Sequence, residues 1–102
     1  MYKLSFFVPK DSCEEVKQIL FKLGVGRIGN YDCCCWQTLG QGQFRALKGA
    51  NPAMGQVDKV EYVEEYKVEM VCADSLIEQA IQELKKSHPY EEVAYEFFKI
   101  NE

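Results

Sequence analysis

The sequence predicts an α+β sandwich in which two helices cover one face of an antiparallel sheet. The main observation is a unit near each end of the chain, where an alternating apolar run is followed by a break and an amphipathic helix. A second observation is the long alternating run over residues 62–72, which is typical of a central strand. The chain has 102 residues, 47% of them hydrophobic and 27% charged, and we therefore expect one globular domain over residues 1–102.

The first unit begins with apolar residues at alternate positions over 2–8, which predict a strand with one buried face. The strand then breaks, and Ser12 and Glu15 have the spacing of a capping box at the start of a helix. Apolar residues recur at helical spacing beyond this point, and Gly24 supplies the left-handed residue that ends the helix.

The second unit repeats this arrangement. Ser75 and Glu78 predict another capping box, and an amphipathic run follows them. Pro89 disfavours helical dihedral angles at His88, so we expect this helix to end there and the last strand to cover residues 93–100. His88 either caps carbonyl groups at the helix end or, as the one histidine of the chain, takes part in a functional site.

The segment between the two units completes the sheet. We expect a strand from Tyr31, a reversal at residues 40–42, a short returning strand over 43–47 and a loop over 48–57. The order of elements is that of a ferredoxin-like βαββαβ sandwich with an extra short hairpin.

The sheet face that the helices leave uncovered is expected to carry apolar side chains. Those predicted there are Phe7, Trp36, Val71, Phe98 and Ile100. Because an exposed apolar patch favours association, we expect a homo-oligomer.

The composition argues against several classes of partner. The net charge is −4, with 16 acidic and 12 basic residues, so we expect no basic face for a nucleic acid. The apolar start of the chain is too short for a signal peptide or a membrane span, and we expect a cytoplasmic protein without a membrane partner. Five cysteines, three of them consecutive, suit no disulfide framework and are expected to be reduced thiols.

Four motifs occur in the order of a known family. They are Gly26-Arg27-Ile28-Gly29-Asn30-Tyr31, Gly40-Gln41-Gly42-Gln43-Phe44-Arg45, Gly49-Ala50-Asn51-Pro52 and His88-Pro89-Tyr90-Glu91-Glu92. With these motifs the chain resembles the inserted domain of the NGG-one-interacting-factor-three family, standing alone as in the small YqfO-like proteins. The His-Pro-Tyr-Glu tetrapeptide also resembles a corner of the trimeric CutA proteins. This implies a fold similar to that of CutA and of the PII signal proteins, and a trimer rather than a dimer.

Two departures from the family affect the expected chemistry. Larger members carry a dinuclear metal site in flanking segments rich in His and Asp. This chain has neither such segments nor more than one His, so we expect no enzyme and no catalytic residue. Family members often have His at the position of Cys33, where a thiolate is softer and favours Cu(I) or Zn(II) over Mg(II) or Mn(II). The predicted metal ligands are His88, Glu91, Cys33 and Cys35, with the two cysteines on one face of a strand, although cysteines here also suit buried packing. Folding is not expected to require a metal.

The glycine-rich middle segment and the corner after the second helix form the predicted binding site for a small anionic ligand. The residues assigned to it are Arg45, Gly40, Gly42, Gly49, Asn51, His88 and Tyr90. The guanidinium would bind the anion together with backbone amides that the glycines leave accessible. The same glycines also suit simple turn formation.

Three functions of different classes follow from these residues. The preferred one is a regulatory module of PII or CutA type, which binds a small molecule or anion between subunits and catalyses no reaction. The others are a protein that binds a divalent or soft metal through His88, Glu91 and a cysteine, and a structural assembly domain.

Overall fold

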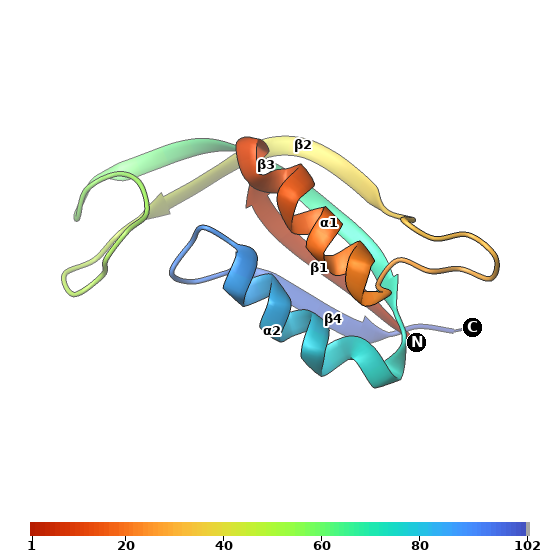
Figure 1. Cartoon of the computed structure of the whole chain (residues 1–102). Helices are drawn as coiled ribbons and strands as arrows, with labels where there is room; N and C mark the ends of the chain where they lie inside the picture. The colour runs from red at the N-terminus through yellow and green to blue at the C-terminus, as the bar shows by residue number, and fades with distance from the viewer. Residues whose placement is uncertain (102) are drawn as a thin grey trace.

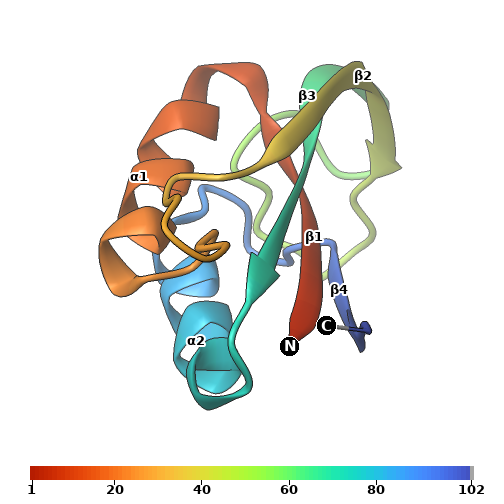
Figure 2. The ribbon, with the colours of Figure 1, turned by 90° about the vertical axis from the view of Figure 1, so that its right-hand side faces the viewer.

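The structure, a computed structural model, describes residues 1–101 and contains a four-stranded antiparallel sheet in the order β2-β3-β1-β4. The elements are β1 (Tyr2–Pro9), α1 (Cys13–Leu23), β2 (Trp36–Arg45), β3 (Val60–Cys72), α2 (Ile77–Ser87) and β4 (Tyr95–Lys99). Both helices lie on one side of the sheet (Figure 1, Figure 2). The predicted ferredoxin-like arrangement of two helices on an antiparallel sheet is confirmed.

The core lies between the helices and the sheet. Alternate residues of β1 face the helices, and Leu4, Phe6 and Val8 have no exposed surface. They pack with buried residues of both helices and of β3, which include Val16, Leu20, Val68, Met70, Ala80 and Leu84. Each fully buried side chain of this size stabilises the fold by about 1.5–3 kcal/mol.

The other face of the sheet points away from both helices (Figure 2). The side chains predicted there fall into two groups: Phe7, Trp36 and Phe98 are exposed, and Val71 and Ile100 are half-buried. Charged side chains lie between them, since Lys3 Nζ is 4.0 Å from Glu69 Oε1. This face, which we call the open face, is therefore mixed in character.

β2 and β3 extend beyond the rest of the sheet. β1 pairs with residues 65–72 of β3, whereas β2 pairs with residues 60–69. Residues 41–45 and 60–64 consequently pair only with each other, and they form a two-stranded arm that projects beyond the ends of the helices in Figure 1. The molecule measures 46 × 24 × 23 Å along its principal axes.

The predicted reversal at residues 40–42, and with it the extra short hairpin, is wrong. β2 continues through Gly40 and Gly42, which pair with Glu65 and Val63 of β3, and the chain reverses in the loop over residues 46–59. Position 42 has no room for a side chain, because an added Cβ would lie 2.0 Å from Glu65 Oε1. This glycine makes room for a neighbouring side chain and does not form a turn.

The two predicted capping boxes are also wrong. A 3-10 turn precedes each helix, Lys10–Ser12 before α1 and Asp74–Leu76 before α2. Ser12 is the N-cap of α1 but its side chain makes no capping hydrogen bond, and the N-cap of α2 is Leu76. The predicted end of α1 is confirmed, because Gly24 follows the helix with φ of 108°.

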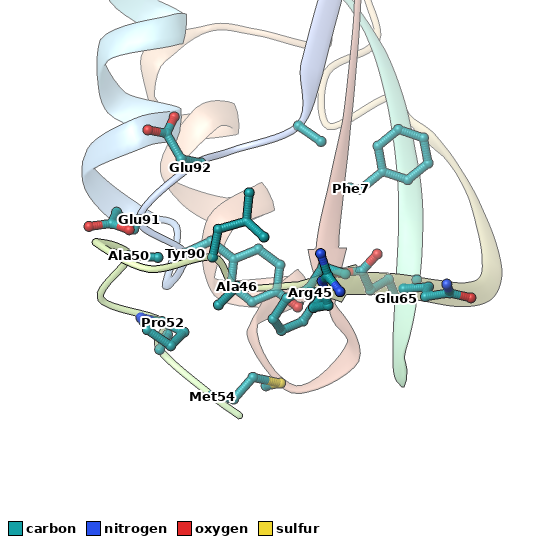
Figure 3. A pocket seen from close by; sticks show the side chains of 16 residues that line it. Phe7, Arg45, Ala46, Ala50, Pro52, Met54, Glu65, Tyr90, Glu91 and Glu92 are labelled. Atoms are coloured by element: carbon teal, nitrogen blue, oxygen red, sulfur yellow. Dashed lines mark hydrogen bonds between the residues drawn. The ribbon is translucent and has the colours of Figure 1, made fainter. Parts of the chain in front are cut away.

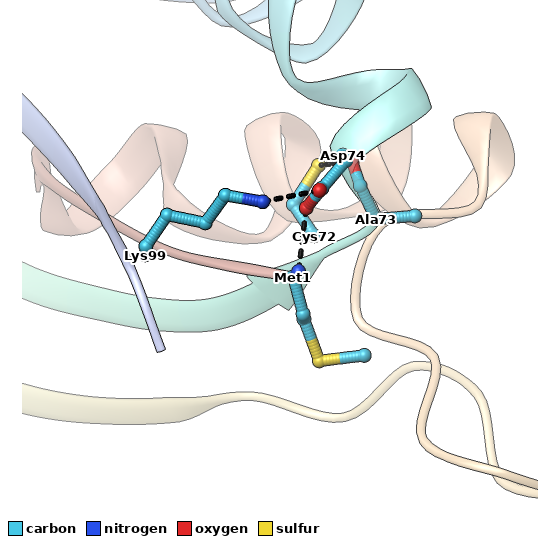
Figure 4. Close-up of polar contacts among 5 residues, drawn as sticks. All are labelled: Met1, Cys72, Ala73, Asp74 and Lys99. Carbon is cyan, nitrogen blue, oxygen red and sulfur yellow. Dashed lines mark hydrogen bonds and ion pairs between the residues drawn. The ribbon is translucent and has the colours of Figure 1, made fainter. Parts of the chain in front are cut away.

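The turn before α2 is tied to two strand ends. The carboxylate of Asp74 accepts a hydrogen bond from the ammonium of Lys99 and lies 2.5 Å from the amino group of Met1 (Figure 4). These cations hold the pKa of Asp74 below its usual value, and the hydrogen bond from Lys99 is the largest cause. The groups are open to solvent, so the contacts orient the chain ends more than they stabilise the fold.

Within the described part of the chain, neither helix has the length and apolar character that crossing a membrane requires.

Candidate ligand pocket

A cavity of about 570 Å³ lies at the base of the arm, beside the corner that follows α2 (Figure 3). Its volume is within the usual range for small-molecule sites. The walls come from β1, β2, β3, the loop over residues 46–59 and the corner: Phe7, Gly42, Gln43, Phe44, Arg45, Ala46, Leu47, Ala50, Pro52, Ala53, Met54, Glu65, Tyr90, Glu91, Glu92 and Ala94. Most of these side chains are apolar, with a small number of charged groups among them.

The corner is held in place by the ring of His88. This residue has the predicted extended conformation, with φ of −77° and ψ of 139°, and α2 ends one residue before it. The backbone N–H of Tyr90 donates to Nδ1 at 3.1 Å, so the ring carries its proton on Nε2, which donates to the carbonyl of Phe7 at 2.7 Å. Burial lowers the pKa of His88. The ring therefore joins the corner to β1, and the carbonyl that it binds belongs to a strand and not to the helix end.

Tyr90 extends from this corner into the centre of the cavity lining (Figure 3). Its hydroxyl donates to Oε2 of Glu65 at 2.8 Å. Burial is the main cause that raises the pKa of Tyr90, and the hydrogen bond to Glu65 adds to it. The ring lies 6.1 Å from that of Phe44 and 5.0 Å from that of His88, measured between centroids. Tyr90 thus connects the corner with β3 and, through Phe44, with β2.

Glu65 has one carboxylate oxygen that remains available. Oε2 accepts the hydrogen bond from Tyr90, while Oε1 lies over Gly42 and has no hydrogen-bond partner within residues 1–101. No buried side-chain nitrogen or oxygen in that range lacks a partner, so this unpaired Oε1 is accessible. A carboxylate held in this way can accept a further hydrogen bond from a molecule in the cavity.

The other charged groups lie around the cavity wall. Arg45, the last residue of β2, is exposed, and its guanidinium makes no ion pair or hydrogen bond within residues 1–101. Glu91 accepts a hydrogen bond from the backbone N–H of Asn51 at 3.2 Å, which joins the loop to the corner. Glu92 completes the charged lining. The cavity therefore has one unpaired guanidinium and three carboxylates.

The structure brings part of the predicted ligand set together. Gly42, Arg45 and Tyr90 line the cavity. Asn51 does not line it, but its backbone N–H donates a hydrogen bond to Glu91, which does. The remaining members lie around it: Gly40 lines a neighbouring hollow on the open face, Gly49 lies in the loop with φ of 99°, and His88 lies behind Tyr90. Glu65, Phe44 and Phe7 were not among the predicted site residues, although Phe44 belongs to one of the four motifs and Phe7 was predicted on the open face. Their meeting at the cavity depends on pairing between distant segments.

The predicted metal ligands do not converge. Within residues 1–101 no group of three or more His, Cys, Asp or Glu side chains could hold a metal ion. Both ring nitrogens of His88 are already engaged in hydrogen bonds. Cys33 and Cys35 are not on one strand face as predicted, because β2 begins at Trp36 and Cys33 lies in a bend with φ of 54°. A metal site built from His88, Glu91, Cys33 and Cys35 therefore stays a prediction, and the arrangement of these residues within a single chain does not support it.

The cysteines also differ from the expected buried packing. Cys33 is exposed and Cys34 is half-buried, whereas Cys35 packs against the core. The buried thiols are Cys13 and Cys72. All five cysteines are free in the structure.

Known proteins resemble this chain over almost its whole length. A protein of Staphylococcus epidermidis named GTP cyclohydrolase 1 type 2 homolog is 37% identical over 100 residues, which are 98% of this chain and 27% of that protein. A Bacillus cereus protein related to NIF3 has a TM-score of 0.83 and 35% identity, over 99% of this chain and 26% of that one. The chain is homologous to one segment of the NIF3-related proteins. It spans about a quarter of the length of the curated relatives that it matches, and no family model matches it.

The resemblance to NIF3-related proteins that the four motifs predicted is thereby confirmed. The predicted likeness to CutA and PII is confirmed at the level of the fold. The PII-like protein CutA from Nostoc sp. PCC 7120 has a TM-score of 0.70 over 99% of this chain and 82% of that one, at 17% identity.

One expectation from the sequence is contradicted. We expected a protein without enzymatic activity, but the curated NIF3-related relatives carry the name of a homolog of an enzyme, GTP cyclohydrolase 1 type 2. The single His was one reason for that expectation. The His count describes this chain alone, which matches about a quarter of the length of those relatives.

Proposed function

We propose that the chain is a ligand-binding module, whose cavity beside Tyr90 takes a small organic molecule with an apolar or aromatic body and an anionic group at Arg45. The observation that carries the proposal is a cavity of about 570 Å³ that combines aromatic walls with a guanidinium unpaired within residues 1–101. Apolar walls with a few polar groups are the usual composition of small-molecule sites. An unpaired Arg is well suited to bind carboxylate or phosphate, because its planar group donates two parallel hydrogen bonds.

We further propose that binding is regulatory, as in the PII and CutA type of module. In the longer NIF3-related proteins, the matched segment would sense a ligand and act on the rest of the chain. The name of these relatives refers to GTP, so purine nucleotides are a natural part of any ligand panel.

We also propose that the module self-associates through its open face, as a trimer. Support comes from Trp36 and Phe98, which are 70% and 53% exposed on this face. Association would remove their apolar surface from water.

The binding proposal is tested with a panel of nucleotides and small phosphorylated metabolites, measured by changes in backbone amide chemical shifts. We expect at least one compound to shift the amides of Phe44, Arg45 and Tyr90. Ala53→Trp fills the cavity and should abolish the shifts, while Ala73→Trp, at an exposed position outside the cavity, should leave them unchanged. Shifts that Ala53→Trp does not affect would contradict the proposal, as would the absence of shifts both with this panel and with benzamidine, benzoate and benzyl alcohol.

A further inference from the structure

The charges around the cavity do not suit a simple anion. Its ionisable lining residues are Arg45, Glu65, Glu91 and Glu92, which give a formal charge of one positive and three negative, a sum of −2, with Tyr90 neutral. The whole chain is also acidic, with a net charge of −4. A ligand that carried only negative charge would be attracted by Arg45 and repelled by the remaining groups.

Glu65 lies between the cavity and the neighbouring hollow on the open face and lines both of them, and its carboxylate can bind a donor there. Tyr90 fixes one of its carboxylate oxygens by a hydrogen bond of 2.8 Å, and the absence of a side chain at Gly42 lets the carboxylate lie against β2. The other oxygen, Oε1, is accessible and unpaired within residues 1–101. Because the half-buried position is shielded from water, a charged donor at Oε1 would form a stronger hydrogen bond than at an exposed site.

The aromatic side chains of the cavity favour the binding of a planar cation in particular. Phe7, Phe44 and Tyr90 line the same cavity as Glu65. The faces of aromatic rings attract a positive charge, and this attraction grows when the charge is removed from water. An amidinium or guanidinium group could therefore lie against a ring while it donates hydrogen bonds to Oε1.

We propose that Glu65 determines the ligand class of this cavity, by selecting a ligand with a planar, positively charged N–H donor group. This inference rests on the proposed binding function. The anionic group of the same molecule would be bound by Arg45, so the expected ligand is dipolar. Tyr90 and Gly42 act as positioning residues for the Glu65 carboxylate.

The test uses three probes of similar size and different charge, namely benzamidine, benzoate and benzyl alcohol. Binding is followed by the amide chemical shifts of Phe44, Arg45 and Tyr90. We expect benzamidine to bind more tightly than the other two. Glu65→Gln retains an oxygen that accepts from Tyr90 but removes the charge, and it should weaken benzamidine binding by about tenfold or more. Glu96→Gln, on β4 and outside the cavity, makes the same change in charge and should have no effect.

The outcomes separate this inference from the proposed function. If benzoate or benzyl alcohol shifts the cavity amides as strongly as benzamidine does, or if Glu65→Gln leaves benzamidine binding unchanged, the inference is wrong while the binding function stands. If neither these probes nor the nucleotide and metabolite panel shift the cavity amides, the binding function itself is overturned.

Discussion

At the scale of single residues, His88 has a structural role that its type alone does not reveal. Both ring nitrogens are used, one as an acceptor for Tyr90 and one as a donor to Phe7. His88 is 6% exposed and is therefore mostly desolvated. A protonated ring could not accept the hydrogen bond from Tyr90, so the corner requires neutral imidazole.

We therefore expect the stability of the fold to depend on the protonation of His88. Burial holds its pKa below the usual 6.5, against the opposing effects of the Phe7 carbonyl and of Glu65. The folded state binds the proton less readily than the unfolded chain, so the stabilising contribution is complete above the unfolded pKa. It is lost as the pH falls through the lower folded pKa.

The measurement is urea unfolding between roughly pH 8 and pH 5, the range in which imidazole titrates. His88→Gln can still form hydrogen bonds but does not titrate. Compared with the unmodified protein, this variant should be less stable at about pH 8 and should lose less stability as the pH falls towards about 5. If the stability of His88→Gln and of the unmodified protein depended on pH in the same way, the pH dependence would come from groups other than His88.

At the scale of the elements, β2 shows how a glycine can serve a neighbouring strand. Both Gly40 and Gly42 were predicted to form a turn, yet both are paired residues of a continuous strand. The surroundings of the two positions differ. A Cβ at Gly40 would meet no atom within 4 Å, whereas a Cβ at Gly42 would collide with the carboxylate of Glu65.

This difference provides a matched pair of substitutions. Gly42→Ala should displace Glu65, break its hydrogen bond to Tyr90 and lower the free energy of unfolding by about 1–3 kcal/mol. Gly40→Ala should change it by about 0.5 kcal/mol or less. Denaturant unfolding gives both values, and equal effects of the two substitutions would contradict the steric role of Gly42.

At the scale of the whole molecule, the open face and the fold predict an assembly larger than one chain of 11.8 kDa. We expect light scattering coupled to size exclusion to give the mass of a trimer. Trp36→Lys or Phe98→Lys should shift the mass towards that of the monomer, because a buried unpaired charge is costly. Tyr31→Lys, at an exposed loop position, is the control. A monomeric mass for the unmodified protein would exclude a trimer interface.

The fold was predictable because its main signals are local. Gly24 and Pro89 act on the backbone beside them, and alternation within β1 and β3 indicates which face is buried. The site was predictable only in part. Glu65 meets Tyr90 across 25 positions of sequence, and this contact depends on strand register and on the path of the loop. Neither composition nor spacing contains that information.

The two-stranded arm has a consequence for motion. Residues 41–45 and 60–64 pair only with each other, and an isolated two-stranded hairpin is marginally stable in water. The arm can therefore open while the core stays folded, and its amide hydrogens should exchange with solvent faster than those shared by β1 and β3. Phe44 and Arg45 belong to this arm, whereas Tyr90 is anchored to the core through His88. A molecule held between them would slow that exchange, and part of its binding free energy would be spent on keeping the arm closed.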